Sequence, residues 1–169
     1  MCAVWPGSEL MAQKFGYINS DFILEKMPEY QEAQQQIDAL AAEWQKEIQG
    51  KQLEIDQMYS ELKAEEVLLT EEMRKEREDK IKEMESALKE YTQKVFGFEG
   101  LFFLKKQELI KPVQEQVFEA VEKVAGQHKL QIVFDKSGDM VMIYTDPIHD
   151  YTDYVLDELG LGDKEDVIR

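Results

Sequence analysis

Polar side chains that could carry chemistry gather in the last third of the chain. They are the only two histidines, His128 and His149, and a series of aspartates: Asp135, Asp139, Asp146, Asp150 and Asp153. No second histidine or cysteine stands at the spacing of a zinc site, and the aspartates lack the order of an EF-hand calcium loop. Turns and helix caps account for these residues. The sequence therefore predicts neither a metal site nor a cofactor.

The sequence also contains no recognisable catalytic motif. No serine or cysteine lies in a recognisable nucleophile context, and the chain has neither a P-loop nor a dinucleotide-binding glycine motif. The single cysteine, Cys2, has no partner for an intramolecular disulfide. We therefore expect a binding protein and no enzyme.

The net charge of the chain excludes some classes of binding partner. The 169 residues carry a formal net charge of -16, which argues against non-specific nucleic-acid binding and against adsorption to anionic lipid. No stretch approaches the roughly 18 consecutive apolar residues of a membrane span. We interpret residues 1–13 as a flexible N-terminus, either a tag or the remnant of an export signal, and residues 161–169 as a C-terminal tail.

The elements that must position any binding surface begin with a long helical hairpin at residues 28–96. Apolar residues recur there in alternating steps of three and four, which is the spacing of a coiled-coil seam. The first leg carries Ile37, Leu40, Trp44, Ile48, Ile55, Met58 and Leu62, and the second carries Met73, Ile81, Met84, Leu88, Tyr91, Val95 and Phe98. Pro28 suits the first turn of the first leg, and Thr70 suits the N-cap of the second, with the tip at 65–70. Gly50 predicts a bend or a close approach of helices.

The flanking residues predict a small mixed body. Residues 14–19 form a strand, Asn19 and its neighbours cap a short helix, and Pro112 begins a helix over 113–125 that Gly126 ends. Two runs, 130–134 and 140–144, are predicted to form an antiparallel hairpin. A final helix covers 150–159, with Asp150 as its N-cap and Gly160 after it.

Three short strands do not make a stable independent sheet, and strands that are apolar on both faces need cover on both sides. We therefore predict self-association, in which copies pool their strands. The fold class is α+β: a small β-sheet or barrel body assembled by oligomerisation, from which a long antiparallel helical hairpin projects. The body comprises residues 14–27 and 97–160, and the hairpin comprises residues 28–96.

Several short segments, taken in this order, resemble the Skp/OmpH-like periplasmic chaperones of Gram-negative bacteria over about residues 14–160. The segments are Phe15-Gly16-Tyr17-Ile18-Asn19, Ile23-Leu24 with Pro28-Glu29-Tyr30, Val133-Phe134-Asp135, and the run from Asp150 to Leu156. The resemblance implies a homotrimer with a β-barrel body and three helical tentacles around a cavity. It also implies an ATP-independent periplasmic holdase that keeps unfolded outer-membrane proteins from aggregating.

One departure concerns charge, because the best-known members of that family are strongly basic. Residues 29–66 contain ten acids and three bases, a net charge of -7, whereas residues 71–94 contain eight acids and seven bases, a net charge of -1. Direct binding of the membrane or of lipopolysaccharide is therefore doubtful for this chain.

Candidate contact residues follow from the seam. Side chains off the seam are the better candidates for touching a client, and methionine serves well at promiscuous surfaces. The predicted client-binding residues are Leu53, Tyr59, Leu68, Met58 and Met73. The predicted core of the trimeric body is Phe15, Tyr17, Ile132, Phe134, Val141 and Ile143. The aromatic run 96–104 is interpreted as the shoulder where the hairpin meets the body, with a cavity-facing or inter-subunit role as the alternative.

Two other functions remain open from the sequence. In a structural coiled-coil adaptor, the seam would join a partner's helices instead of closing within the chain. A cytoplasmic prefoldin-like chaperone would share the hairpin and differ in its location.

Overall fold

The computed structural model describes residues 13–138 and 141–162. The chain divides into two compact units. We call residues 31–111 the hairpin unit; the body unit contains residues 13–30, 112–138 and 141–162. The predicted division into a body at 14–27 and 97–160 and a hairpin at 28–96 stays a prediction, because compactness does not test which parts fold or act separately.

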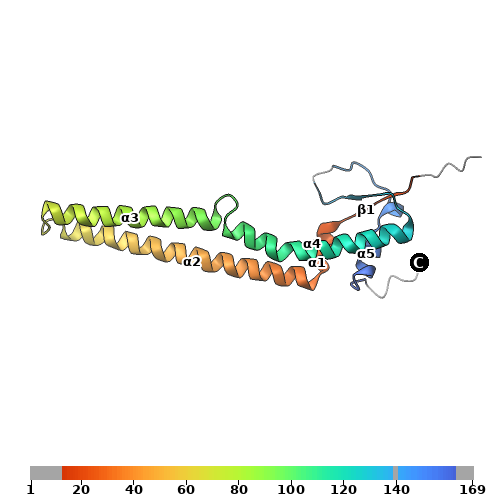
Figure 1. Cartoon of the computed structure of the whole chain (residues 1–169), viewed down its shortest axis with the longest axis horizontal. Helices are drawn as coiled ribbons and strands as arrows, with labels where there is room; N and C mark the ends of the chain where they lie inside the picture. The colour runs from red at the N-terminus through yellow and green to blue at the C-terminus, as the bar shows by residue number, and fades with distance from the viewer. Residues whose placement is uncertain (1–12, 139–140, 163–169) are drawn as a thin grey trace, which may run out of the picture. The chain divides into compact units, whose positions relative to one another are not determined.

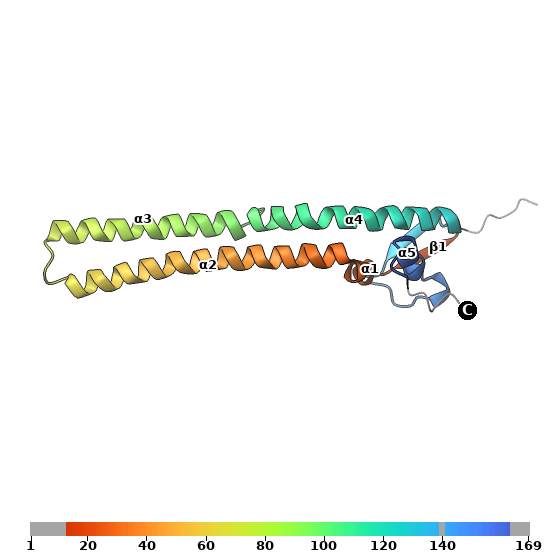
Figure 2. The ribbon, with the colours of Figure 1, turned by 90° about the horizontal axis from the view of Figure 1, so that it is seen from below.

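The chain is mostly helical, with one long helical hairpin and one small sheet. Helices α2 (Pro28–Glu65) and α3 (Glu71–Phe96) form the legs of the hairpin, and they run side by side in both views (Figures 1 and 2). The predicted start at Pro28 is confirmed. The predicted cap of the second leg is confirmed too, because the Thr70 side chain accepts a hydrogen bond from the Met73 N–H at 3.3 Å.

Helix α2 continues through Gly50 without interruption. A methyl group added at this position would meet no atom within 4 Å. A close approach of neighbouring helices, which was one expectation for this glycine, is therefore wrong.

Helix α4 (Leu101–His128) follows α3 after four residues and is longer than predicted. A helix start at Pro112 and a stop at Gly126 are both wrong, since α4 passes through both residues. Proline removes one backbone hydrogen bond, but Ile110 and Val113 on either side of it are buried, and burial of aliphatic side chains offsets that loss. The chain leaves the helix at Lys129, which has a left-handed φ of 57°.

The body unit contains a two-stranded parallel sheet. Strand β1 (Phe15–Ile18) pairs with β2 (Ile132–Asp135), with Phe15 opposite Ile132 and Ile18 opposite Asp135. The predicted antiparallel hairpin of 130–134 with 140–144 is wrong, because residues 141–144 form no strand; residues 139 and 140 lie outside the described residues. The partner of β2 is β1, which lies more than a hundred residues earlier in the chain. A pattern of neighbouring apolar runs does not predict a pairing over that separation.

The core of the body unit joins β1 to three helices: α1 (Ser20–Lys26), the second half of α4, and α5 (Thr152–Glu158). Its buried members are Ile18, Ile23, Leu24, Met27, Val113, Val117, Ala120, Val124, Val155 and Leu156. The members from α4 recur in steps of three and four residues, so they form one apolar stripe on that helix.

N-cap residues fix where the short helices of the body unit begin. The Asn19 side chain accepts a hydrogen bond from the Phe22 N–H at 3.1 Å, which confirms the predicted cap of α1. A short 3-10 helix, η1 (Pro147–His149), precedes α5. The predicted start of the last helix at Asp150 is wrong, because Tyr151 occupies the N-cap of α5, although the Asp150 carboxylate still accepts from the Thr152 N–H at 3.0 Å. Gly160 follows α5 as predicted, with a φ of 74°.

Candidate functional site

The hairpin closes a hydrophobic seam between its own legs. Ile55 of α2 and Ile81 and Leu88 of α3 form a buried cluster. The half-buried side chains packed against it are Ile48, Met58, Leu62 and Met84. The seam predicted from sequence is wrong at two positions: Phe98 is 96% exposed, beyond the end of α3, and Met73 is 47% exposed near the tip.

Two tyrosines link the legs by hydrogen bonds. The Tyr59 hydroxyl donates to Glu85 Oε1 at 3.0 Å, and the Tyr91 hydroxyl donates to Glu47 Oε2. Each hydrogen bond to a carboxylate raises the pKa of its tyrosine above the ordinary value, because ionisation of the phenol would place two negative charges together. Tyr59 thus has a contact within the hairpin that its position off the seam did not predict.

The predicted client-binding residues are distributed along the legs and do not form one site. Leu53, Tyr59, Leu68 and Met73 are exposed, and Leu68 is 83% exposed at the tip. Met58 instead packs against the buried cluster of the seam. Their role in client binding stays a prediction.

A shallow groove of about 710 Å³ lies along the hairpin. Its apolar part comes from Ile48, Ile55, Leu88 and Phe96, and polar side chains from both legs lie among them: Gln52, Glu85, Lys89, Thr92 and Gln93. An apolar floor with polar walls gives a weak, adaptable surface, in contrast to the enclosed pockets that bind small molecules.

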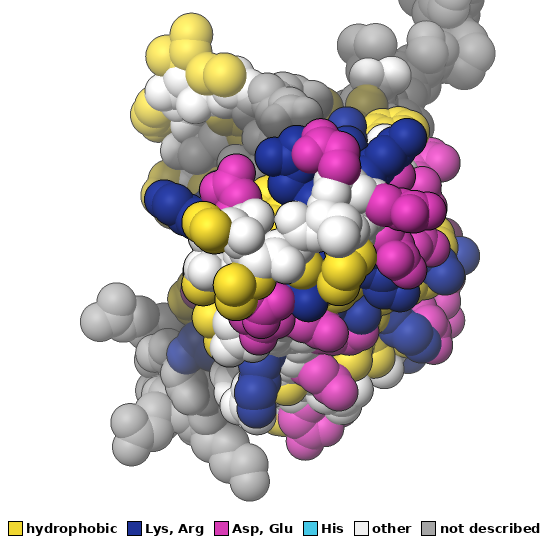
Figure 3. Space-filling view, turned by 90° about the vertical axis from the view of Figure 1, so that its left-hand side faces the viewer, with side chains coloured by type: hydrophobic (Ala, Val, Ile, Leu, Met, Phe, Trp, Pro, Cys, Tyr) yellow, Lys and Arg dark blue, Asp and Glu magenta, His cyan; other side chains and the backbone are white. Residues whose placement is uncertain are grey.

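Ion pairs hold the chain reversal at the tip. Arg77 contacts Glu65 at 2.7 Å, and Arg74 contacts Glu71 at 2.7 Å and Glu66 at 3.7 Å. Figure 3 views the molecule from the tip side and shows hydrophobic side chains lying between acidic and basic ones. The tip is therefore a mixed surface, without a large patch of one charge.

The residues predicted for the trimeric core have very different exposures in a single chain. Tyr17 is buried and Phe134 is half-buried, whereas Phe15 and Ile132 are about half exposed. Val141 and Ile143 are 86% and 99% exposed, so they do not belong to the core of one chain. Their burial between copies stays a prediction.

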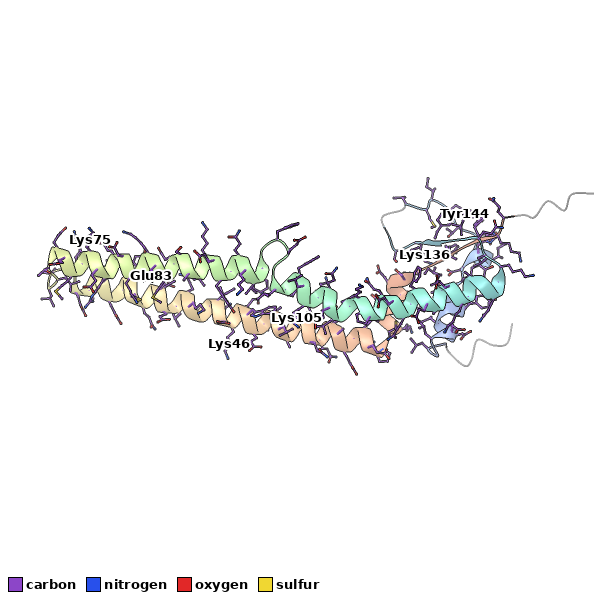
Figure 4. The ribbon with its side chains drawn as sticks, in the orientation of Figure 1. Lys46, Lys75, Glu83, Lys105, Lys136 and Tyr144 are labelled. Atoms are coloured by element: carbon purple, nitrogen blue, oxygen red, sulfur yellow. The ribbon has the colours of Figure 1, made fainter. Side chains whose placement is uncertain are left out.

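An apolar cavity of about 460 Å³ lies in the body unit beside these residues. Its walls come from the sheet and from the segment after it: Phe15, Gly16, Tyr17, Phe134, Met142, Tyr144, Thr145, Asp146 and His149. Figure 4 labels Tyr144 in that segment, and its side chain is 81% exposed. The cavity is therefore bounded on one side by the exposed Tyr144 and by half-buried residues of the same segment.

A polar network joins the carboxyl ends of the two strands. Asp135 accepts hydrogen bonds from the Ser20 hydroxyl at 2.5 Å and the Ser137 hydroxyl at 2.6 Å, and from both backbone N–H groups. Burial alone would raise the pKa of the Asp135 carboxyl, but these hydrogen bonds outweigh it and hold that pKa below its usual value.

Asp150 extends the network to α5. Its carboxylate accepts from Thr152 and Lys136, and the Thr152 hydroxyl in turn accepts from the Asn19 N–H at 3.0 Å. Burial by itself would raise the pKa of the Asp150 carboxyl. The hydrogen bonds from Thr152 and Lys136 and the positive charge of Lys136 outweigh burial, so this pKa lies below its usual value. Sequence analysis assigned both aspartates to turns and caps but could not show that Asp135 binds Ser20, which lies more than a hundred positions earlier in the chain.

The histidines face aromatic rings. The His128 ring lies 5.1 Å from Tyr151 and 4.5 Å from Tyr154 between centroids, and His149 lies 4.8 Å from Phe15. Within 13–138 and 141–162, no three His, Cys, Asp or Glu side chains are grouped so that they could hold a metal ion. In the same residues, no helix has the length and apolarity that crossing a membrane requires.

Two comparisons with known proteins give an OmpH-like match. A family model described as outer membrane protein (OmpH-like) matches residues 14–159. Among solved structures, an OmpH-like protein of Caulobacter crescentus CB15, described as a candidate outer membrane chaperone, matches with a TM-score of 0.70 at 13% identity. The match covers 94% of this chain and 90% of that one. The comparison with curated proteins gives no match.

Proposed function

The chain belongs to the family of OmpH-like outer membrane proteins, and this membership supports a general chaperone function. We propose that the chain is an ATP-independent periplasmic holdase. Its clients are unfolded outer-membrane β-barrel proteins, which it holds in a cavity between helical tentacles. Holding prevents aggregation by keeping the apolar strands of one client away from those of another.

The observation that carries this proposal is the hairpin. Its legs fill a narrow seam with their own side chains and leave Leu53 exposed part-way along α2 and Leu68 and Met73 exposed at the tip. Each exposed side chain offers a client only a small apolar contact. Many weak contacts within one enclosure retain a chain through effective concentration, and they release it without a nucleotide because no single contact is strong.

A homotrimer supplies the enclosure in this proposal. A sheet of only two strands is marginal by itself, and the body unit carries exposed apolar side chains on the residues that follow β2, including Val141, Ile143, Tyr144 and Ile148. Pairing between copies would cover these side chains and the open strand edges. Phe15, Tyr17, Ile132 and Phe134 would then contribute to the shared core.

The two alternative functions have less support. A coiled-coil adaptor would keep its seam for a partner, whereas Ile55, Ile81 and Leu88 already bury one another within one chain. A cytoplasmic prefoldin-like chaperone would share the hairpin, but the matching family model is OmpH-like.

The acidic first leg shapes the choice of partner. Its net charge of -7 over residues 29–66 gives no basic surface for lipopolysaccharide, anionic lipid or nucleic acid. Contacts with clients would therefore be mainly apolar, with charge acting on the rate of encounter.

Aggregation of a diluted client tests the proposal. An outer-membrane β-barrel protein is diluted from urea into buffer without ATP, and light scattering is followed with and without this chain. We expect suppression at one assembled trimer per client. Undiminished scattering at that ratio would contradict the proposal, and a control with a helical client of similar size separates holding of barrel proteins from general crowding.

A further inference from the structure

The stretch from residue 96 to residue 106, which we call the aromatic segment, exposes more large apolar side chains than any other part of the hairpin unit that the structure describes. Five of its eleven residues are exposed hydrophobics: Phe96, Phe98, Leu101, Phe103 and Leu104. Exposed hydrophobics that occur singly are ordinary, but a concentration of this kind marks an interaction surface.

A tight backbone turn at the end of α3 places part of this segment in an exposed loop. Helix α3 ends at Phe96, and the Gly97 N–H caps it by donating to the Gln93 carbonyl oxygen at 2.8 Å. A Cβ at Gly97 would lie 2.1 Å from that same oxygen, so the tight turn requires glycine. The loop between α3 and α4 projects from the helices in Figure 1, and Phe98 within it is 96% exposed.

The first turns of α4 are covered on one side only, where the half-buried Phe102 ring lies 5.7 Å from the Phe96 ring between centroids. Residues 103–108 are all exposed. Phe103 lies two turns before Ile110 and therefore on the same helical face, yet Phe103 is 50% exposed whereas Ile110 is 9% exposed. The apolar face of α4 thus begins about two turns before the packing that covers it.

The aromatic segment itself carries a small positive charge. Residues 96–106 contain two lysines and one glutamate, a net charge of +1 within a chain of net charge -16. Lys105 pairs with Glu108 at 2.7 Å, whereas Lys106 is exposed and has no ion pair among the described residues. A positive charge beside exposed phenylalanines complements a ligand that is both aromatic and anionic.

We propose that the aromatic segment binds an extended stretch of unfolded polypeptide in which an aromatic side chain lies close to a carboxylate. The aromatic side chain packs against Phe98 and Phe103, and the carboxylate lies near Lys106. This inference rests on the proposed holdase function and names the client segment that it selects. Transmembrane β-strands carry aromatic residues at both membrane interfaces, so their unfolded chains supply many such stretches.

Peptide binding tests the proposal on the full-length protein. Fluorescein-labelled peptides of about ten residues, the length of one membrane-spanning strand, are measured by anisotropy in three matched forms. The first alternates Phe and Thr and contains two Asp, the second replaces each Asp by Lys, and the third replaces each Phe by Ser. We expect the first peptide to bind tightest and the third to bind weakest.

Variants then locate the site. Replacing Phe98→Ser together with Phe103→Ser should weaken binding of the first peptide about tenfold. Lys106→Glu should weaken it about threefold and should favour the Lys-containing peptide. Two changes of equal chemistry elsewhere serve as controls: Val67→Ser, at a tip residue that is 96% exposed, and Lys75→Glu, at an exposed lysine of α3 that Figure 4 labels far along the hairpin from Lys105. Both controls should bind the first peptide as the unchanged protein does.

Several results would overturn the proposal. If the variant with Phe98→Ser and Phe103→Ser binds the first peptide with unchanged affinity, the aromatic segment is not the binding site. If that variant binds all three peptides more weakly by the same factor, the segment does not select aromatic and acidic peptides. If Phe98→Ser lowers the mass of the assembly while peptide affinity is unchanged, a second copy covers the segment instead. Circular dichroism checks that each variant retains its helices, and Phe98→Ser alone, which lies in a loop, serves if the double variant does not.

The outcome is separable from that of the proposed function. If the unchanged protein suppresses client aggregation and the variants bind peptides equally well, the holdase function stands and this inference fails. If the unchanged protein suppresses nothing but ranks the three peptides as expected, the segment is a peptide site and the holdase function fails.

Discussion

The hairpin unit and the body unit bury their apolar side chains in different ways. In the hairpin unit, the second leg covers the first, so that Ile55, Ile81 and Leu88 are buried by residues at most a few tens of positions away. In the body unit, a compact core coexists with Val141, Ile143 and Tyr144, which the described residues leave exposed. The two legs of the hairpin thus cover their seam within one chain, whereas the body unit leaves a run of apolar side chains exposed, which we propose other copies cover.

Truncating the seam should give the largest effect. Ile55→Ala removes a side chain that is 1% exposed, and we expect it to lower the free energy of unfolding of the hairpin by about 2–5 kcal/mol. Hydrogen exchange should show faster exchange of amides in α2 and α3, with amides of β1 and β2 unchanged. Equal acceleration in both units would break the comparison, because it would mean that they unfold together.

Truncating the exposed apolar segment of the body should act on assembly alone. Ile143→Ser should raise the dissociation constant between copies about tenfold or more and leave the melting of the dissociated chain unchanged. Sedimentation over a range of concentrations measures both states. Val67→Ser, at a comparably exposed tip residue, is the matched control and should leave the assembly as it is; an equal effect of both changes would remove the special role of the body.

The Asp135 network should give the body a dependence on acid that the hairpin seam lacks. Its pKa is lowered in the folded state, so the carboxylate stabilises the fold above the unfolded value of about 3.9. That stability is lost as pH falls through the lower folded pKa. Asp135→Asn should cost about 1 kcal/mol at pH 7, a small value because the carboxylate is only half-buried and stays partly solvated.

Thermal melting between pH 7 and pH 3 measures this contribution. The difference in melting temperature between the unchanged protein and Asp135→Asn should shrink toward pH 3. A difference that stays constant with pH would show that the network acts through shape and hydrogen bonding, independent of charge.

The smallest expected effect concerns Gly50. Gly50→Ala should stabilise the hairpin by about 0.5–1 kcal/mol, because glycine weakens a helix interior and the added methyl group meets no atom within 4 Å. Chemical denaturation followed by helical signal measures it. No gain, or a loss of holdase activity without loss of stability, would show that α2 uses flexibility at this point.

Sequence alone predicted the hairpin well because its determinants are local. Periodicity, Pro28 and Thr70 act within a few residues of the structure that they specify. Prediction was weaker for individual contacts: spacing placed Tyr59 off the seam but could not reveal its hydrogen bond to Glu85, and it placed Phe98 on a seam that ends before it.

The body was harder to predict because its pairing is non-local. The apolar runs 130–134 and 140–144 suggested a local hairpin, but β2 pairs with β1 from the start of the chain. Likewise, Ser20 and Asp135 each match a turn or a cap, and their mutual hydrogen bonds depend on the tertiary fold. A motif scan therefore assigned these residues a smaller role than they have.

The parallel pairing of β1 with β2 also has a consequence for biogenesis. All residues of the hairpin lie between these two strands in sequence, so the β1 segment is synthesised first and its partner emerges only after both legs. Closing so long a connection is slow unless the intervening chain has already become compact. We expect the hairpin to form first and the sheet last, so that each newly made copy keeps β1 unpaired until β2 has been synthesised.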